Sequence, residues 1–293
     1  MNELSKTATD YNLIMIELTN CCNLDCEYCY RSRMNLKGRM LTEEELLFRL
    51  ERIKEGIPIL FCGMGEQITH PRFYDLLKLA SGHQIQLVTN GTIDIDVERL
   101  IELNNVYSIT ISVDGPDAAT ASKSCSHYKF DVLTRNLERL SRQKSILTAI
   151  NFVLSGDNMD AVFSMADFCN KYNVSALNLL LPTTDMKWVR ENYGRIYELL
   201  AELKKYVKEQ KYNLFIGMPD TMFCMFKGKI TPYISVEGYV RPCCSHDRGV
   251  NVVGRIQKNT MDEIMKGKAW KAFIDEFDCS RCSMNQFHFA FKE

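Results

Sequence analysis

The sequence has almost no net charge and no long apolar run. Its 293 residues include 36 Lys and Arg against 37 Asp and Glu, a formal net charge of −1, so the chain lacks the basic footprint of a nucleic-acid-binding protein. No apolar run approaches membrane-spanning length; Leu177–Leu181, for example, contains Asn178 and is stopped by Pro182. The segment Met1–Asp10 is polar and unlike a signal peptide. We therefore expect a cytoplasmic protein with no nucleic-acid or membrane partner.

Cysteine is the residue that the chain has in excess, with twelve in total. In a reducing cytoplasm, cysteines indicate metal ligands or catalysts rather than disulfides. The twelve are concentrated toward the two ends of the chain. Four lie at Cys21, Cys22, Cys26 and Cys29, five at Cys224, Cys243, Cys244, Cys279 and Cys282, and three between them at Cys62, Cys125 and Cys169. This clustering predicts two separate metal sites.

Between the two cysteine groups, short β-rich runs alternate with amphipathic segments. The predicted strands are Leu13–Leu18, Ile57–Cys62, Ile85–Thr89, Val106–Val113, Ile146–Leu154 and Ala176–Leu181. The predicted helices are Glu43–Ile53, which a capping box of Thr42 and Glu45 opens, then Phe73–Ala80, Val97–Leu103, Lys129–Leu140 and Met159–Lys171. Six strands separated by five helices imply a parallel sheet with crossover helices. Because a full eight-stranded barrel usually needs more residues, we expect a partial barrel, followed by a charged helix over about Lys187–Lys211.

The first metal site is predicted at Cys22-x3-Cys26-x2-Cys29, directly after the first strand. Three thiolates can hold three irons of a [4Fe–4S] cluster and leave the fourth iron open for another ligand. A zinc site would need a fourth ligand nearby, and no His or Cys occurs in the thirty residues after Cys29. Cys21 is adjacent to Cys22, and neighbouring residues rarely chelate one tetrahedral ion together. The spacing therefore favours an iron–sulfur cluster over zinc.

This motif, in a loop leaving the first strand of a βα barrel, resembles that of the radical S-adenosylmethionine (SAM) superfamily. The resemblance covers about residues 12–182. It implies that the open iron binds the amino and carboxylate groups of SAM, and that electron transfer from the cluster releases a 5′-deoxyadenosyl radical. It also implies that Tyr28, just before the third cysteine, lies against the adenine.

Three further elements resemble the same family at the ends of predicted strands. Gly63-Met64-Gly65-Glu66 is similar to the Gly-Gly-Glu element that holds the SAM amino group, although Met64 replaces the first glycine of that pattern. Asn90 follows the third strand, and Ser112 and Asp114 lie at the end of the fourth. The residues that the resemblance implies for SAM binding are Tyr28, Gly63, Met64, Gly65, Glu66, Asn90, Ser112 and Asp114.

The second metal site is predicted in the tail, where Cys224, Gly238-x4-Cys243 and Cys279-x2-Cys282 resemble the twitch, or shortened SPASM, extension of radical SAM enzymes. The implied ligands are Cys224, Cys243, Cys279 and Cys282, and no cysteine follows Cys282. Four thiolates close one auxiliary [4Fe–4S] cluster completely. Cys244 can exchange roles with Cys243, and a zinc ribbon with four cysteine ligands is the alternative.

The expected architecture is an α/β fold with a partial (β/α)6 barrel of the radical SAM type over residues 1–185. A bridging helix over 186–214 and a small auxiliary-cluster domain over 215–293 complete it. The resemblance implies that the radical abstracts hydrogen from a substrate carbon and that the auxiliary cluster takes an electron. The expected reaction is an oxidative modification, such as a cross-link or dehydrogenation, of a peptide or natural-product precursor. A low-potential electron donor, such as flavodoxin or ferredoxin, is the expected protein partner.

Several alternatives stay open at this point. The absence of a segment ahead of the first strand favours a small substrate, as in dehydrogenation of an aminocyclitol alcohol, or a peptide bound directly at the mouth of the barrel. A peptide epimerase would use a cysteine as hydrogen donor, and its candidates are Cys62, Cys125, Cys169 and Cys244. A scaffold with two zinc sites is the non-enzymatic alternative. Trp188 and Trp270, at helical positions, are predicted to be packing residues.

Overall fold

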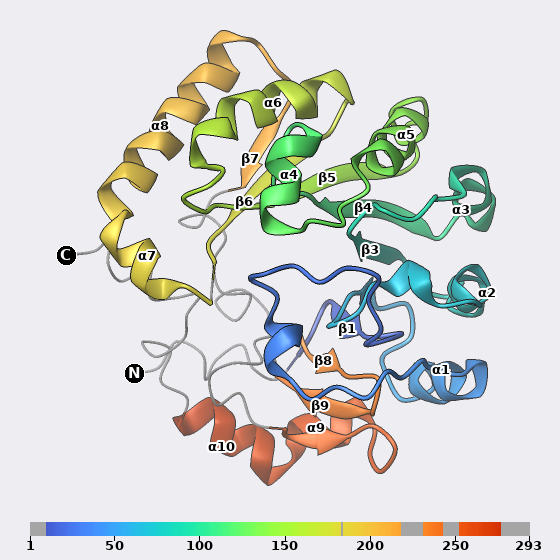
Figure 1. Cartoon of the computed structure of the whole chain (residues 1–293). Helices are drawn as coiled ribbons and strands as arrows, with labels where there is room; N and C mark the ends of the chain where they lie inside the picture. Colours follow the sequence, from blue (N-terminus) through green and yellow to red (C-terminus); the bar gives the residue numbers. More distant parts are fainter. Residues whose placement is uncertain (1–9, 183, 218–230, 243–251, 277–293) are drawn as a thin grey trace.

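The computed structural model of the chain describes residues 10–182, 184–217, 231–242 and 252–276. Six strands lie side by side in sequence order at the centre of the fold, each parallel to the next (Figure 1). They are β1 (Ile14–Ile16), β2 (Ile59–Phe61), β3 (Ile85–Thr89), β4 (Val106–Ser112), β5 (Leu147–Val153) and β6 (Ala176–Leu180). Each strand falls within its predicted range, and the parallel order confirms the predicted α/β partial-barrel class.

Helices connect these strands, and most of them lie along the outer side of the sheet (Figure 1). They are α1 (Glu43–Leu50), α2 (Phe73–Leu79), α3 (Val97–Leu103), α4 (Ala118–Ser124), α5 (Phe130–Ser141) and α6 (Val162–Lys171), with short 3-10 turns at Tyr30–Arg33, Gln67–Thr69 and Met159–Ala161. The capping box of α1 is present, because the Glu45 amide donates to the Thr42 hydroxyl and the Thr42 amide donates to the Glu45 carboxylate. Helix α4, whose first turn is capped by the Asp117 carboxylate, was not predicted from the sequence.

Apolar side chains from the strands and the inner faces of the helices form one continuous core. Ile16 in β1, Phe61 in β2 and Leu133 in α5 are among the residues with no exposed surface. This core fixes the strand ends, so the loops that follow them start from rigid positions.

Strands outside the predicted six extend the sheet at both edges. At one edge, β7 (Phe215–Gly217) pairs parallel with β6. At the other, β8 (Tyr233–Ile234) pairs parallel with β1, and β9 (Tyr239–Arg241) and β10 (Gly254–Arg255) continue as antiparallel neighbours. The helices α9 (Met261–Lys266) and α10 (Lys268–Glu276) follow (Figure 1). The segment predicted to form a separate tail therefore contributes strands to the same sheet as the barrel.

The prediction of a single helix over about Lys187–Lys211 is wrong at one point. The structure has two helices, α7 (Met186–Glu191) and α8 (Tyr193–Glu209), which meet at Asn192. The Asn192 side chain donates to the Trp188 carbonyl at 2.9 Å, and its own amide donates to the same oxygen at 3.0 Å. Asparagine competes with the helix ladder in this way, so the first helix ends there.

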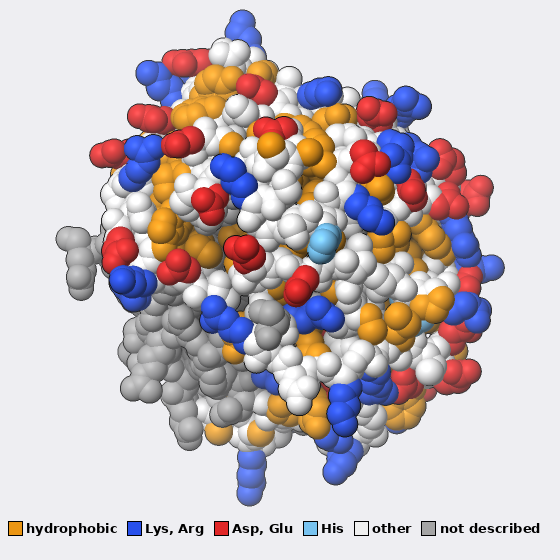
Figure 2. All heavy atoms as spheres, in the orientation of Figure 1, with side chains coloured by type: hydrophobic (Ala, Val, Ile, Leu, Met, Phe, Trp, Pro, Cys, Tyr) orange, Lys and Arg blue, Asp and Glu red, His pale blue; other side chains and the backbone are white. Residues whose placement is uncertain are grey.

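Charged side chains of both signs interleave over the face of the molecule shown in Figure 2. Within the four described ranges, no helix combines the length and the apolar composition that a bilayer crossing requires.

Candidate active site

The three motif cysteines lie in the loop that follows β1, at the edge of the sheet where all six parallel strands end. Cys22, Cys26 and Cys29 are all partly buried. The loop turns tightly, because the Cys29 amide donates to the Cys26 carbonyl at 3.0 Å and the Leu24 amide donates to the Cys22 sulfur at 3.5 Å. Ligand and cofactor sites of open α/β sheets occur at this edge.

Cys29 acts electrostatically on both of the other motif thiols. Burial raises the pKa of Cys22 and of Cys26, and the charge of Cys29 raises both further. An iron–sulfur cluster binds thiolates, so loading the cluster must release protons from this loop. Three half-buried thiols on one short loop fit such a cluster. No three His, Cys, Asp or Glu side chains in the described part of the chain are gathered as one metal ion would require.

The loop after β2 packs directly on the cysteine loop. A Cβ on Gly65 would lie 2.8 Å from the Asn20 carbonyl carbon and closer still to the carbonyl oxygens of Thr19 and Cys21, so only glycine fits. The next amide, that of Glu66, donates to the Cys21 carbonyl at 2.8 Å. Gly63 is constrained by Glu17, because a Cβ added at Gly63 would lie 2.7 Å from the carboxyl carbon of Glu17.

Glu66 is 3% exposed and uses both carboxylate oxygens inside the protein. One oxygen accepts from the Ile68 amide at 3.1 Å and the Thr89 hydroxyl at 2.9 Å, and the other accepts from the Asn90 amide at 2.6 Å. Burial raises the pKa of Glu66, and these hydrogen bonds oppose the rise. The carboxylate therefore joins the loops after β2 and β3.

Asn90 links that arrangement back to the cysteine loop. Its side-chain amide donates to Asn23, which lies next to Cys22, at 2.9 Å. The Asn90 carbonyl accepts from the Tyr128 hydroxyl at 2.6 Å, and the same hydroxyl lies 2.9 Å from the Ser112 carbonyl. Tyr128 thus joins the ends of β3 and β4. Sequence reasoning missed it, because a single tyrosine between two helices carries no motif.

Asp114 holds Tyr28 in place from the end of β4. It is 5% exposed and accepts hydrogen bonds from the Tyr28 hydroxyl, from the Ser124 hydroxyl at 3.0 Å and from the Val153 amide at 2.9 Å. Burial raises the pKa of Asp114, and the bond from Tyr28 is the largest opposing effect. The structure therefore brings the two predicted residues together, with the carboxylate turned toward the phenol.

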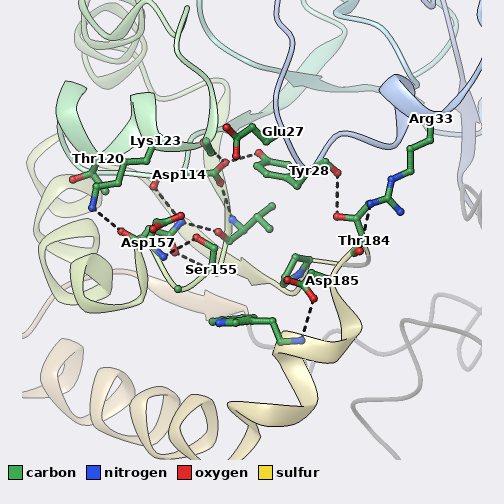
Figure 3. Close-up of a pocket in the computed structure, with 16 residues that line it drawn as sticks. Glu27, Tyr28, Arg33, Asp114, Thr120, Lys123, Ser155, Asp157, Thr184 and Asp185 are labelled. Carbon is green, nitrogen blue, oxygen red and sulfur yellow. Dashed lines mark hydrogen bonds between the residues drawn. The ribbon is translucent and has the colours of Figure 1, made fainter.

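A pocket of about 480 Å³ opens beside Tyr28 and Asp114 (Figure 3). Its other walls come from α4 and from the segments that follow β5 and β6, and the Thr184 hydroxyl donates to the Tyr28 carbonyl at 3.3 Å. Trp188 lines the pocket as well as packing against the core. The charged side chains around the pocket are Glu27, Arg33, Lys123, Asp157 and Asp185. This volume suits a ligand of nucleoside size.

The cysteines suggested as hydrogen donors have different surroundings. Cys169 lies in the core on α6 with no exposed surface, and Cys125 is 3% exposed and in hydrogen-bond contact with Cys26. Cys62 is partly buried at the end of β2. Cys244 lies outside the described residues, as do the four predicted ligands of the auxiliary cluster, Cys224, Cys243, Cys279 and Cys282.

Two sequence profiles match the chain. Residues 16–169 match the radical SAM superfamily, and residues 224–283 match SPASM, an iron–sulfur cluster-binding domain. The first match covers just over half of the chain and contains the three motif cysteines. The second range contains all four predicted auxiliary ligands.

Relatives and solved structures agree with these matches. The sporulation killing factor maturation protein SkfB of Bacillus subtilis is 23% identical over 265 residues, which are 85% of this chain and 63% of SkfB. The GTP 3′,8-cyclase of Synechocystis is 24% identical over 85% of each chain. The structure of Streptococcus suis SuiB bound to S-adenosylmethionine has a TM-score of 0.75 at 14% identity, over 92% of this chain and 68% of SuiB. Another SuiB structure holds the precursor peptide SuiA.

The matched family and domain define the cofactors, which are SAM, the [4Fe–4S] cluster that binds it and an auxiliary iron–sulfur cluster. At its level of identity, the likeness to SuiB shows the fold. The chain belongs to the radical SAM superfamily and carries a SPASM iron–sulfur cluster-binding domain.

Proposed function

We propose that the protein catalyses an oxidative modification, such as a cross-link or dehydrogenation, of a peptide or natural-product precursor. When bound, the cluster and SAM supply a 5′-deoxyadenosyl radical that takes hydrogen from a substrate carbon, and the auxiliary cluster takes an electron. The observation that carries the proposal is the direct packing of the cysteine loop on the loop after β2, beside a pocket of about 480 Å³.

In this proposal Cys22, Cys26 and Cys29 hold the SAM-binding cluster. The Gly63–Glu66 loop lies at the amino end of SAM, and the pocket in Figure 3 receives the adenosine part beside Tyr28. Asp114 keeps the Tyr28 ring fixed through the phenol. Rigid surroundings of this kind aim a reactive group and exclude water from it.

The auxiliary cluster is assigned to Cys224, Cys243, Cys279 and Cys282, which the SPASM match spans. Four thiolates leave no iron open, so this cluster relays an electron rather than binding substrate. The initial electron comes from a low-potential donor such as flavodoxin or ferredoxin. A peptide substrate is supported by the likeness to SkfB, a maturation protein, and by the fold shared with peptide-bound SuiB.

The test is anaerobic purification followed by turnover with SAM, dithionite and candidate precursor peptides. Two clusters give about eight irons per chain with matching sulfide, and zinc alone would contradict the proposal. Mass spectrometry then reads the product. A loss of about two mass units indicates oxidation or cross-linking, whereas deuterium uptake from D2O without other mass change indicates epimerisation.

The role of the auxiliary cluster has a separate test. Changing both Cys279 and Cys282 to Ala removes two of its proposed ligands, and we expect SAM cleavage to persist while the oxidised product disappears. Liquid chromatography of 5′-deoxyadenosine, with mass spectrometry of the substrate, measures both. Product formation at the wild-type rate would rule out the electron-acceptor role.

A further inference from the structure

The turn between β8 and β9 is held by a side chain from helix α1. Arg49 of α1 is 1% exposed, and its guanidinium donates to the Ser235 carbonyl at 2.9 Å and to the Val236 carbonyl at 2.7 Å. The turn ends at Gly238, whose φ of +82° lies in the left-handed region that favours glycine. Beyond it, β9 ends at Arg241, two residues before Cys243 in the sequence, which is a proposed ligand of the auxiliary cluster.

Glu17 connects this turn to the loop after β2. It is the residue that follows β1 and is 2% exposed. One of its carboxylate oxygens accepts from the Met64 amide at 2.6 Å, and the other accepts from the Val236 amide at 2.9 Å. Burial raises the pKa of Glu17, and the Val236 and Met64 amides and the Tyr233 side chain of β8 oppose the rise. A single side chain therefore bridges the loop proposed for the SAM amino group and the turn that leads to Cys243.

A second bridge reaches the cysteine loop from the same turn. The Asn20 side chain, two residues before Cys22, donates to the Glu237 carboxylate at 3.1 Å and accepts from the Arg39 amide at 2.7 Å. The cysteine loop and the loop after β2 are thus both attached to residues 236–237 of the turn.

We propose that Glu17 is a positioning residue that fixes the SAM-binding loop relative to the auxiliary-cluster segment. This inference rests on the proposed function. A carboxylate is required because both of its oxygens accept a backbone N–H, whereas an amide offers one acceptor and one donor. In a Glu17→Gln variant, the amide nitrogen must face the Met64 or the Val236 amide, and one of the two connections breaks. Gly63 is explained by the same contact, because the Glu17 carboxylate occupies the space of a Cβ there.

The expected consequence is imprecise placement of SAM rather than loss of the fold. A hydrogen bond to a charged acceptor supports roughly a tenfold change in affinity, so we expect the KM for SAM to rise about tenfold in Glu17→Gln. The kcat for 5′-deoxyadenosine should change less than KM. Because the radical is aimed less well, more 5′-deoxyadenosine should form per product molecule.

The experiment compares the wild-type and Glu17→Gln holoenzymes in KM, kcat and the ratio of 5′-deoxyadenosine to product. Hydrogen–deuterium exchange of both cluster-free chains supplies a readout that does not depend on activity. We expect faster exchange in the variant for the peptide that contains Met64, the one that contains Val236, or both. Arg49→Lys is the matched control, because it loosens the turn without contacting Met64; its KM for SAM should stay within about twofold of wild type.

Tyr233→Phe is the milder variant if Glu17→Gln does not fold, because it removes only a hydroxyl that acts on the carboxylate and leaves both amide contacts in place. It should change KM and the product ratio in the same direction by a smaller factor. If Glu17→Gln and Tyr233→Phe both had the KM for SAM, the product ratio and the hydrogen–deuterium exchange of the wild type, the positioning role would be overturned. A rise of the KM for SAM in Arg49→Lys as large as that in Glu17→Gln would overturn it too. Wild-type enzyme that forms no 5′-deoxyadenosine would instead overturn the proposed function.

Discussion

At the residue scale, the two acidic side chains predicted to bind SAM are held by the protein itself. Glu66 accepts three hydrogen bonds and Asp114 accepts three, and in both cases burial raises the pKa. Buried carboxylates of this kind are stabilised by their donors, so each holds its loops at a fixed distance. Direct contact of either group with SAM stays a prediction, and it requires an oxygen that already accepts a hydrogen bond to accept another.

Asp114→Ala should both destabilise the protein and weaken SAM binding. The change leaves the Val153 amide and the Ser124 and Tyr28 hydroxyls without this acceptor, at a cost of about 1–3 kcal/mol in the free energy of unfolding. Urea unfolding of the cluster-free chain measures that cost, and the KM for SAM measures the effect on the pocket. Tyr28→Phe, which removes one of the three bonds, should have a smaller effect on stability. If the urea midpoint of unfolding of Asp114→Ala equalled that of the wild type, the structural role of Asp114 would be contradicted.

Single changes of Cys22, Cys26 or Cys29 to Ala should abolish 5′-deoxyadenosine formation, because each removes one proposed ligand of the SAM-binding cluster. Chromatography of reaction mixtures containing SAM and dithionite gives the measurement. Cys169→Ala is the matched control, because this thiol is on α6 and is buried in the apolar core, away from the cysteine loop. The variant should form 5′-deoxyadenosine as the wild type does. Persistence of 5′-deoxyadenosine in any of the three motif variants would show that the ligand is misassigned.

At the element scale, Gly65→Ala should separate the loop after β2 from the cysteine loop. The added Cβ meets backbone atoms of residues 19–21, which cannot rotate away. A displacement near 1 Å in an active site can cost roughly 10²-fold in rate, so we expect a loss of that order in 5′-deoxyadenosine formation with an unchanged circular dichroism spectrum. Gly82→Ala is the control, because nothing lies within 4 Å of its Cβ position. Equal rates for the two variants would contradict the close packing.

Helices and strands with a clear hydrophobic periodicity were predicted from the sequence. Strands that form by pairing with distant segments of the chain were not. The bounds of β3 and α3 agree with their predicted ranges, because alternation and helical periodicity are local properties. By contrast, β8 has only two residues, and its pairing with β1 joins segments more than two hundred residues apart in the sequence. The break between α7 and α8 at Asn192 depends on a hydrogen bond from one side chain to a carbonyl of its own helix. Hydrophobic periodicity does not reveal such a bond.

The site divides in the same way. The cysteine motif and the Gly63–Glu66 element were recognisable because their residues are close together in sequence. Glu17 was not, because its partners Met64 and Val236 lie 47 and 219 residues away. An acidic residue at the end of a buried strand was the available signal, since a charge there needs compensating donors.

At the scale of the whole molecule, the two matched regions share one sheet. The β8–β10 strands cover the edge of β1, and Arg49, Glu17 and Asn20 fasten the turn after β8 to the barrel. Both the SAM-binding region and the segment leading to the auxiliary cluster are therefore built on the same rigid strands. In the proposed function, this common sheet is the rigid link between the SAM-binding loops and the segment that precedes Cys243.

A chain truncated after residue 217 should therefore fail to fold on its own. Truncation exposes the edge of β1, a ready site for aggregation, and removes both carbonyl partners of the buried Arg49 guanidinium. We expect the fragment to aggregate or to lack a cooperative thermal transition, while the full chain unfolds in a single transition. Circular dichroism during heating, with size-exclusion chromatography, measures both properties. A soluble monomeric fragment that melts cooperatively would instead favour an independent barrel, as the sequence-based boundary near residue 185 implies.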